Sequence, residues 1–263
     1  MIRFCSLFSG SSGNSIFIAS GSTRLLIDAG LSAKRITQAL NSIGEKPEEL
    51  SAILISHEHS DHVKGAGIIS RKYNVPIYAN TGTWSAMEMP IGPVDSSNKL
   101  LFETGCDFYI GDINVKTFAI PHDASEPVGF NFFIDGKKVT TATDIGHIDD
   151  ELLCCLENSE LILLESNHDI EMLKVGPYPW HLKKRILGDS GHLSNEKAGE
   201  VIAYLIEKGT RRFLLGHLSR ENNFPELAYQ TVKNIICEKT AGLECEIMLE
   251  VALRDQVGKV INI

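Results

Sequence analysis

The segment 57–62 packs four potential metal ligands into six residues. It reads His-Glu-His-Ser-Asp-His and directly follows the apolar, strand-like stretch 52–55. In an extended chain the side chains at i and i+2 point the same way, so His57 and His59 can converge on one cation. After the chain turns, Asp61 and His62 can reach a second. Imidazole and carboxylate ligands together suit Zn²⁺, Mn²⁺ or Fe better than Ca²⁺ or Mg²⁺, so the segment predicts a metal centre rather than a solvated histidine-rich loop.

Three further potential ligands each follow another strand-like stretch. They are His122 after 115–120, Asp144 after 138–141 and His217 after 213–215. Loops at strand ends, from separate parts of an α/β fold, can meet around one site. Each residue alone would be interpreted as a satisfied or solvated side chain. Together with the run 57–62 they predict one shared site.

Alternating helical and strand-like patterns predict an α/β protein in which two sheets pack face to face with helices outside. Strands are expected at 4–8, 15–18, 24–27, 52–55, 76–78, 108–110, 113–120, 129–134, 138–141, 161–164 and 213–215. Helices are expected at 33–42, 62–72, 83–87, 148–156, 195–208 and 225–238, with Ser194 as the N-cap of the fifth. Asp135-Gly136 is a hairpin signal.

Length and composition favour one cytoplasmic domain. The 263 residues are 43% hydrophobic, enough for a substantial core, and no apolar run is long enough for a membrane helix. The six cysteines show no C-x-x-C spacing, which fits a reducing compartment. The net charge of −9 argues against indiscriminate coating of a polyanion. It does not exclude a nucleic-acid substrate, since bound divalent cations would reverse the local field.

Five elements, taken in order, resemble the metallo-β-lactamase superfamily. They are Asp28 in the stretch 26–30, the run 57–62, His122, Asp144 and His217. The resemblance covers nearly the whole chain. It implies an αββα four-layer sandwich of the α/β (α+β) class, with two mixed sheets and helices outside, as a single domain over 1–263.

The resemblance also implies a ligand set for two divalent cations, Zn²⁺ or Mn²⁺ with Fe possible. The first cation would be bound by His57, His59 and His122, the second by Asp61, His62 and His217, with Asp144 bridging them. Asp28 would orient the ligand loop, since metal-bound imidazoles need their tautomers fixed. The alternative for Asp28 is a turn residue at a strand end.

Finer motifs resemble the YycJ/WalJ (VicX) family, which is similar to RNase Z-type nucleases. They are the stretches 9–15, 165–169, 191–196 and 216–223. This resemblance implies a metal-dependent 5′-to-3′ DNA exonuclease linked to DNA repair, acting on the 5′ end of single- or double-stranded DNA, with RNA also possible. No membrane partner is expected, and the oligomeric state stays open.

Two cations about 3.5–4 Å apart suit phosphodiester hydrolysis, because they can hold a hydroxide and stabilise both the attacking and the leaving oxygen. Asp61 is the candidate general base. His192 with Glu196 resembles the proton-donating pair of RNase Z; the alternative is a histidine that caps a helix and packs.

Four other residues are candidates for supporting roles. Glu165 is expected to be a buried carboxylate that orients its neighbours, and His168 is either a site residue or a structural support. Ser219 and Arg220 could grip a phosphate by a hydroxyl and a planar fork of donors; the alternative is a helix turn with a solvated arginine. The basic stretch 181–185 beside Tyr178 and Trp180 fits a single-strand binder or a charged helix face.

Other functions remain open. An RNase, or a small-molecule phosphodiesterase or thioesterase, would use the same metal centre. A non-enzymatic reading is an accessory regulator of a two-component signalling pathway. The chain lacks a β-CASP insertion and a Gly/Pro-rich arm, which disfavours processing of transfer RNA.

Overall fold

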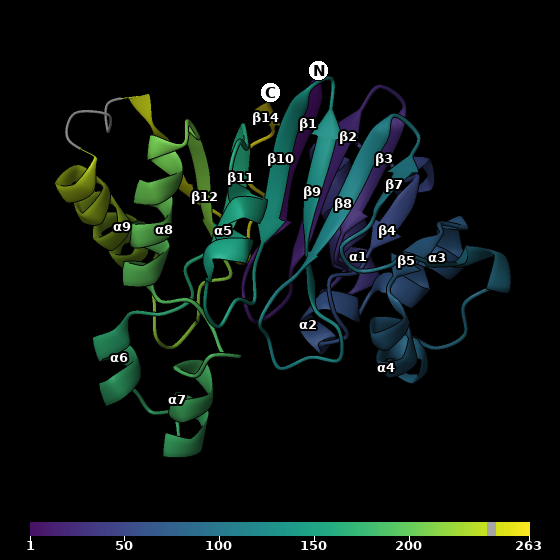
Figure 1. Ribbon diagram of the computed structural model, residues 1–263. Coiled ribbons are helices and arrows are strands. Elements are labelled where there is room, and N and C mark those ends of the chain that lie inside the picture. The colour runs from purple at the N-terminus through teal and green to yellow at the C-terminus, as the bar shows by residue number, and fades with distance from the viewer. Residues whose placement is uncertain (241–245) are drawn as a thin grey trace. The chain divides into compact units, whose positions relative to one another are not determined.

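The computed structural model describes residues 1–240 and 246–263 (Figure 1). These residues form two compact units. The first unit comprises Met1–Ala119, Ala124–Asp135 and Leu253–Ile263. The second comprises Ile120–Asp123 and Gly136–Ala252. The strands form two mixed sheets, and helices accompany the strands in both units. The predicted α/β class with two mixed sheets is therefore confirmed, while a single domain over 1–263 stays a prediction.

The first unit is built on a seven-stranded sheet with the order β14-β1-β2-β3-β4-β5-β6. Antiparallel pairing joins β14, β1, β2 and β3, and parallel pairing joins β3, β4, β5 and β6. The first unit also contains an antiparallel meander of β7, β8 and β9. The strands are β1 Ile2–Phe8, β2 Ser15–Ser20, β3 Thr23–Ile27, β4 Ala52–Leu54, β5 Ile77–Ala79, β6 Lys99–Leu101, β7 Asp107–Ile110, β8 Ile113–Ala119, β9 Val128–Ile134 and β14 Ile261–Asn262.

Helices of the first unit cover apolar side chains of this sheet. They are α1 Ala33–Ser42, α2 Ser60–Val63, α3 Ala66–Tyr73 and α4 Thr81–Ile91, with short 3₁₀ turns η1 Pro47–Glu49 and η2 Ser96–Asn98. Helix α1 buries Ile36, Ala39 and Leu40 on one face, in a cluster that includes Leu26 and Ile53 of the central strands. This apolar layer holds β3 and β4, whose C-terminal ends carry the ligand loops.

The second unit contains four parallel strands in the order β10-β11-β12-β13. Every residue of β11 is buried, as expected for a parallel strand covered on both faces. Helices α8 and α9 lie side by side (Figure 1). The elements are β10 Lys137–Ala142, β11 Leu161–Glu165, β12 Arg212–Gly216, β13 Met248–Val251, α5 Asp150–Leu156, α6 Ile170–Val175, α7 Trp180–Ile186, α8 Asn195–Glu207 and α9 Pro225–Lys239.

Most predicted elements are confirmed within two residues at each end, and Ser194 caps α8 by accepting from the Lys197 N–H. The predicted helix 62–72 is wrong as a single element, because the chain breaks between α2 and α3. The prediction missed the strands β6, β13 and β14 and the helices α6 and α7. The missed strands have two to four residues, too few for an alternating pattern to stand out.

Two compositional expectations can be compared with the structure. The described cysteines Cys5, Cys106, Cys154, Cys155 and Cys237 are free, and Cys245 lies outside the described residues. Within residues 1–240 and 246–263 no helix combines the length and the apolar character needed to cross a membrane.

At Gly30 the fold leaves no room for a side chain, because the backbone of the run 57–62 lies directly against it. A Cβ built on Gly30 would lie 1.5 Å from the Asp61 carbonyl oxygen and 2.7 Å from the Asn14 nitrogen. The Gly30 N–H donates to the Asn14 carbonyl, and the Asn14 N–H donates to the Asp61 carbonyl. Both neighbours are backbone, so a substitution must move a segment that carries a predicted ligand.

We expect Gly30→Ala to lower the free energy of unfolding by about 3 kcal/mol or more, since the clash is with backbone that cannot rotate away. Chemical denaturation measures the loss. Gly44→Ala is the matched control: its φ is +79° and its Cβ would meet nothing within 4 Å, so it should lose only about 1 kcal/mol from backbone strain. Equal losses for the two variants would contradict the predicted clash.

Candidate metal centre

The first unit brings the side chains of the run 57–62 together. His57 and His62 are fully buried, and their ring centroids lie 4.0 Å apart. The His57 Nε2 atom lies 3.1 Å from the Nδ1 atom of His59, and His59 is also the N-cap residue of α2. The expected convergence of His57 and His59 is thus present. The short helix α2 then returns Asp61 and His62 to the same place, with 3.7 Å between Asp61 Oδ2 and His62 Nε2.

Asp28 fixes the orientation of this run. It follows β3 with a φ of 59°, a left-handed conformation that aspartate tolerates better than most residues. Its carboxylate accepts hydrogen bonds from the Ser56 N–H at 2.9 Å, the Ser56 hydroxyl at 2.9 Å and the His62 Nδ1–H at 2.8 Å. With its proton on Nδ1, His62 keeps the lone pair of Nε2 for another partner. Ser56 is a site residue that sequence reasoning missed.

Asn14 is a second missed residue, although it lies in the stretch 9–15 that resembles the YycJ/WalJ family. Its Nδ2 lies 3.0 Å from His62 Nε2, and its Oδ1 accepts from the Gly10 N–H at 2.9 Å. The loop therefore holds the Asn14 amide against the imidazole nitrogen that a cation would use.

In the second unit, His122, Asp144 and His217 lie together. All three are buried, and each comes shortly after a strand, as expected. The Asp144 Oδ1 atom lies 3.3 Å from His217 Nδ1 and 3.8 Å from His122 Nε2. Asp144 and His217 have φ values of 62° and 55°. Left-handed backbone at residues other than glycine is uncommon and costs energy, and it concentrates at functional sites.

Glu165, at the end of β11, organises this group. Its Oε1 accepts from His192 Nδ1–H at 3.0 Å and from His217 Nδ1–H at 2.7 Å, and its Oε2 accepts from the backbone N–H groups of Ile145 at 2.7 Å and Leu193 at 3.0 Å. Burial alone would raise the pKa of Glu165. The charges and hydrogen bonds of His192 and His217 outweigh burial and hold that pKa well below its ordinary value, so the carboxylate is ionised and acts only as an acceptor.

The tautomers fit a cation. His122 donates from Nδ1 to the Gly191 carbonyl at 3.2 Å, and burial lowers the pKa of His122, with Asp144 opposing the shift. The Nε2 atom of His122 is therefore the ring nitrogen that can face a cation, as it is for His62 and His217, whose Nδ1 atoms contact Asp28 and Glu165. Neutral imidazoles fixed at Nδ1 by carboxylates or carbonyls are the arrangement in which histidine binds transition metals.

The residues predicted for proton donation and phosphate binding differ in their burial and in their partners. His192 is paired with Glu165, and among the described residues the buried Glu196 Oε2 atom has no hydrogen-bond partner. The structure does not pair His192 with Glu196, so their joint role stays a prediction. Ser219 is buried and its hydroxyl accepts from the Asn222 N–H, whereas Arg220 is exposed. The expected supporting role of Glu165 agrees with its contacts.

Asparagine side chains, which sequence reasoning missed, secure the loop after β12. The Asn167 Nδ2 group donates to the His217 carbonyl at 2.8 Å, and the Ser219 N–H donates to the Asn167 carbonyl at 2.7 Å. Asn223 is buried and donates to the carbonyls of Ser166 and Asn167. Asn167 and Asn223 belong to motifs noted in the sequence, but nothing in their spacing indicated which backbone groups they would bind.

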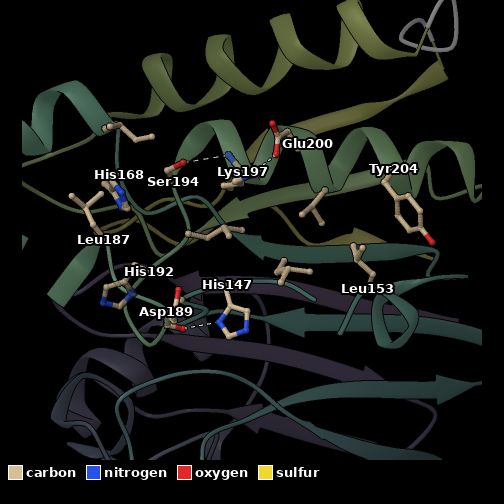
Figure 2. Close-up of a pocket in the computed structure, with 15 residues that line it drawn as sticks. His147, Leu153, His168, Leu187, Asp189, His192, Ser194, Lys197, Glu200 and Tyr204 are labelled. Carbon is tan, nitrogen blue, oxygen red and sulfur yellow. Dashed lines mark hydrogen bonds and ion pairs between the residues drawn. The ribbon is translucent and has the colours of Figure 1, made fainter. Parts of the chain in front are cut away.

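A cavity of about 470 Å³ opens beside His192 in the second unit. Figure 2 shows it with His168 and His192 towards one end and Leu153 and Tyr204 towards the other. Its size lies in the range of small-molecule sites, about 300–1,000 Å³. His168, predicted as a site residue or a support, is part of its wall.

Comparison with known proteins assigns the fold and a family. Residues 23–218 match the family model described as "Beta-lactamase superfamily domain". The chain is similar to the exodeoxyribonuclease WalJ of Streptococcus pneumoniae, with 46% identity over 92% of this chain and 90% of that protein. It is also similar to the exodeoxyribonuclease YycJ of Bacillus anthracis, with 42% identity over 92% of each chain.

Solved structures agree on the fold. The metallo-β-lactamase fold protein YhfI of Bacillus subtilis superposes with a TM-score of 0.71 over the whole of both chains, at 15% identity. At that identity the likeness shows the fold alone. The predicted metallo-β-lactamase fold is confirmed, and the His and Asp clusters of such a fold imply that divalent metals are bound.

We expect Glu165→Gln to lower the free energy of unfolding by about 2–3 kcal/mol, because all four of its partners are N–H donors and the new NH₂ group must face some of them. Chemical denaturation of the metal-free protein measures this. The exposed Glu160→Gln, just before β11, is the matched control and should change stability by less than about 0.5 kcal/mol. Equal losses would contradict the account of Glu165.

Asp28→Asn should reduce metal affinity roughly 10- to 100-fold while leaving the fold intact, because asparagine keeps the left-handed backbone but weakens the hold on the His62 tautomer. Competition with a chromophoric chelator measures the affinity. Asp135→Asn is the matched control: Asp135 also has a positive φ, 50°, and lies in an exposed turn. Metal affinity equal to that of the wild type in Asp28→Asn would contradict the role assigned to Asp28.

Proposed function

Because the chain belongs to the metallo-β-lactamase superfamily, and within it to the family of the exodeoxyribonucleases WalJ and YycJ, we propose that it is a metal-dependent phosphodiesterase that removes nucleotides from the 5′ end of DNA. The chain covers 90% of WalJ and 92% of YycJ. The activity named for each relative therefore belongs to a protein that this chain matches over nearly its whole length. Action in DNA repair and a cytoplasmic location are part of this proposal.

The observation that carries the proposal is the repeated pairing of a buried carboxylate with a ligand histidine. Asp28 accepts from His62 Nδ1, and Glu165 accepts from His217 Nδ1. Burying two acid–imidazole pairs costs desolvation energy that a purely structural role does not require. Orientation of imidazole lone pairs towards a cation is a function that this arrangement serves well.

We assign two divalent cations to the seven predicted ligands, Zn²⁺ or Mn²⁺, with Fe also compatible with the donors. His57, His59 and His122 would hold one cation, Asp61, His62 and His217 would hold the other, and Asp144 would be shared by both. When bound, such a pair supplies a hydroxide at neutral pH and neutralises the charge that develops on the phosphate.

The chain's own residues supply proton transfer and positioning. Asp61 accepts the proton of the attacking solvent molecule. His192 is held by Glu165 through Nδ1, so its Nε2 is the atom that can protonate the 3′-oxygen that leaves. Glu196, at the start of α8, assists this donor in the proposal. Arg220 is exposed and able to bind a backbone phosphate, whereas Ser219 shares its hydroxyl with Asn222.

A time course on 5′- and 3′-end-labelled oligonucleotides tests this function. Single- and double-stranded DNA and RNA, bis(p-nitrophenyl) phosphate and a glutathione thioester are compared with Mn²⁺ and with Zn²⁺. The proposal expects mononucleotides to appear first from the 5′ end of DNA. If RNA or the thioester is turned over faster than DNA, that compound becomes the assigned substrate. If no substrate is turned over, a regulatory role is favoured.

Asp61→Asn should lower kcat on DNA by about 10²- to 10⁴-fold, the range for losing a positioned proton acceptor. Asp150→Asn is the matched control, since Asp150 is exposed at the start of α5, and it should retain full activity. Metal content is measured on both variants, so that loss of a ligand is distinguished from loss of a base. Equal kcat in Asp61→Asn and the wild type would contradict the assignment.

A further inference from the structure

The cavity beside His192 has a lining that suits a small, mostly apolar ligand. Its walls are mainly apolar, with side chains from Ile148, Leu153, Ile170 and Val201. Two of its three charged residues, Lys197 and Glu200, form an ion pair at 2.8 Å, and the third, Asp189, is exposed. Such a lining favours an uncharged, largely apolar ligand with a few polar atoms.

His168 provides the polar group that this cavity leaves unsatisfied. It is 1% exposed, and neither of its ring nitrogens has a hydrogen-bond partner within residues 1–240 and 246–263. Burial lowers the pKa of His168 to about 4. The ring is therefore neutral near pH 7 and offers one N–H donor and one nitrogen acceptor. Leaving such groups unpaired costs about 1–3 kcal/mol each, which a ligand would recover.

The backbone holds His168 firmly in the cavity wall. A β-bridge joins His168 to Ser194, and the Asn195 N–H donates to the His168 carbonyl at 2.9 Å. Figure 2 shows His168 and His192 at the same end of the cavity. The His192 ring lies 5.3 Å from that of His217 and 5.1 Å from that of His122. The His168 end is thus the end nearest the predicted ligands of the second unit.

We propose that this cavity binds one nucleobase of the DNA strand held at the metal centre, and that His168 hydrogen-bonds the edge of that base. The inference rests on the proposed function and deepens it. A nucleobase is planar, uncharged and apolar on its faces, and its edge presents donors and acceptors together. It matches both the apolar walls and the donor–acceptor pair of a neutral imidazole. His168 is a binding residue in this account and takes no part in bond cleavage.

The test removes the base and the imidazole separately and together. A 5′-phosphorylated oligonucleotide with phosphorothioate linkages, which slow turnover, is compared with versions that carry an abasic residue at each of the first four positions. Binding to the metal-loaded protein is measured by fluorescence anisotropy for the wild type, His168→Leu and His168→Gln. The exposed Tyr109→Leu, which also replaces a ring by leucine at a residue with no assigned role, is the matched control.

At one position, loss of the base should weaken binding to the wild type about 5- to 10-fold. His168→Leu should bind the intact oligonucleotide equally weakly and lose nothing further at that position. His168→Gln keeps a donor and an acceptor and should recover most of the affinity. His168→Leu should be at least as heat-stable as the wild type, because leucine removes an unsatisfied polar group.

Val201→Phe provides an independent test, since it places a larger side chain in the cavity from α8 and leaves the His168 residue itself unchanged. It should reproduce the position-specific loss. If His168→Leu weakens binding by the same factor with every abasic oligonucleotide as with the intact one, no base depends on His168. That result would overturn the inference and make His168 a structural residue. If the oligonucleotides do not bind while bis(p-nitrophenyl) phosphate is still hydrolysed, DNA is the wrong substrate class, and both proposals fail on that ground.

Discussion

The carboxylate of Glu165 is the interaction on which the arrangement of the second unit's functional side chains depends. It accepts N–H groups from three separate segments: Ile145 after β10, His192 and Leu193 before α8, and His217 after β12. A single buried charge thereby fixes a predicted metal ligand, a predicted proton donor and the backbone next to Asp144. Asp28 does the same work in the first unit through Ser56 and His62. In each unit, one buried carboxylate thus orients imidazoles that are predicted to act at the metal centre.

Backbone strain is concentrated at the same places. Six described residues other than glycine have a positive φ, and three of them are Asp28, Asp144 and His217. Each such residue costs roughly 1–3 kcal/mol. The cost is tolerated because buried hydrogen bonds hold these residues: Asp28 by Ser56 and His62, and His217 by Glu165 and Asn167. Rigid placement of ligands is what a metal centre requires.

The clustering of the predicted ligands could be inferred from the sequence because those residues are dense or follow apolar strands directly. The local sequence pattern was enough to find the run 57–62. It was also enough to find His122, Asp144 and His217, because each follows a strand-like stretch. It could not identify Asn14 or Asn167, whose partners, His62 and the His217 carbonyl, lie 48 and 50 residues away in the chain. Likewise, the pairing of His192 with Glu165 instead of Glu196 depends on where β11 ends relative to α8. Short edge strands such as β6 and β14 carry too little pattern to be seen.

We propose that the imidazoles oriented by these buried carboxylates bind two cations in each chain. The most direct measurement is metal stoichiometry of the purified protein, by mass spectrometry of the metals and by titration of metal-stripped protein with Mn²⁺ and Zn²⁺. The account predicts two equivalents per chain, with activity on 5′-labelled DNA restored as the second equivalent binds. Binding of none or one equivalent, with activity unaffected by removal of the metals, would contradict it.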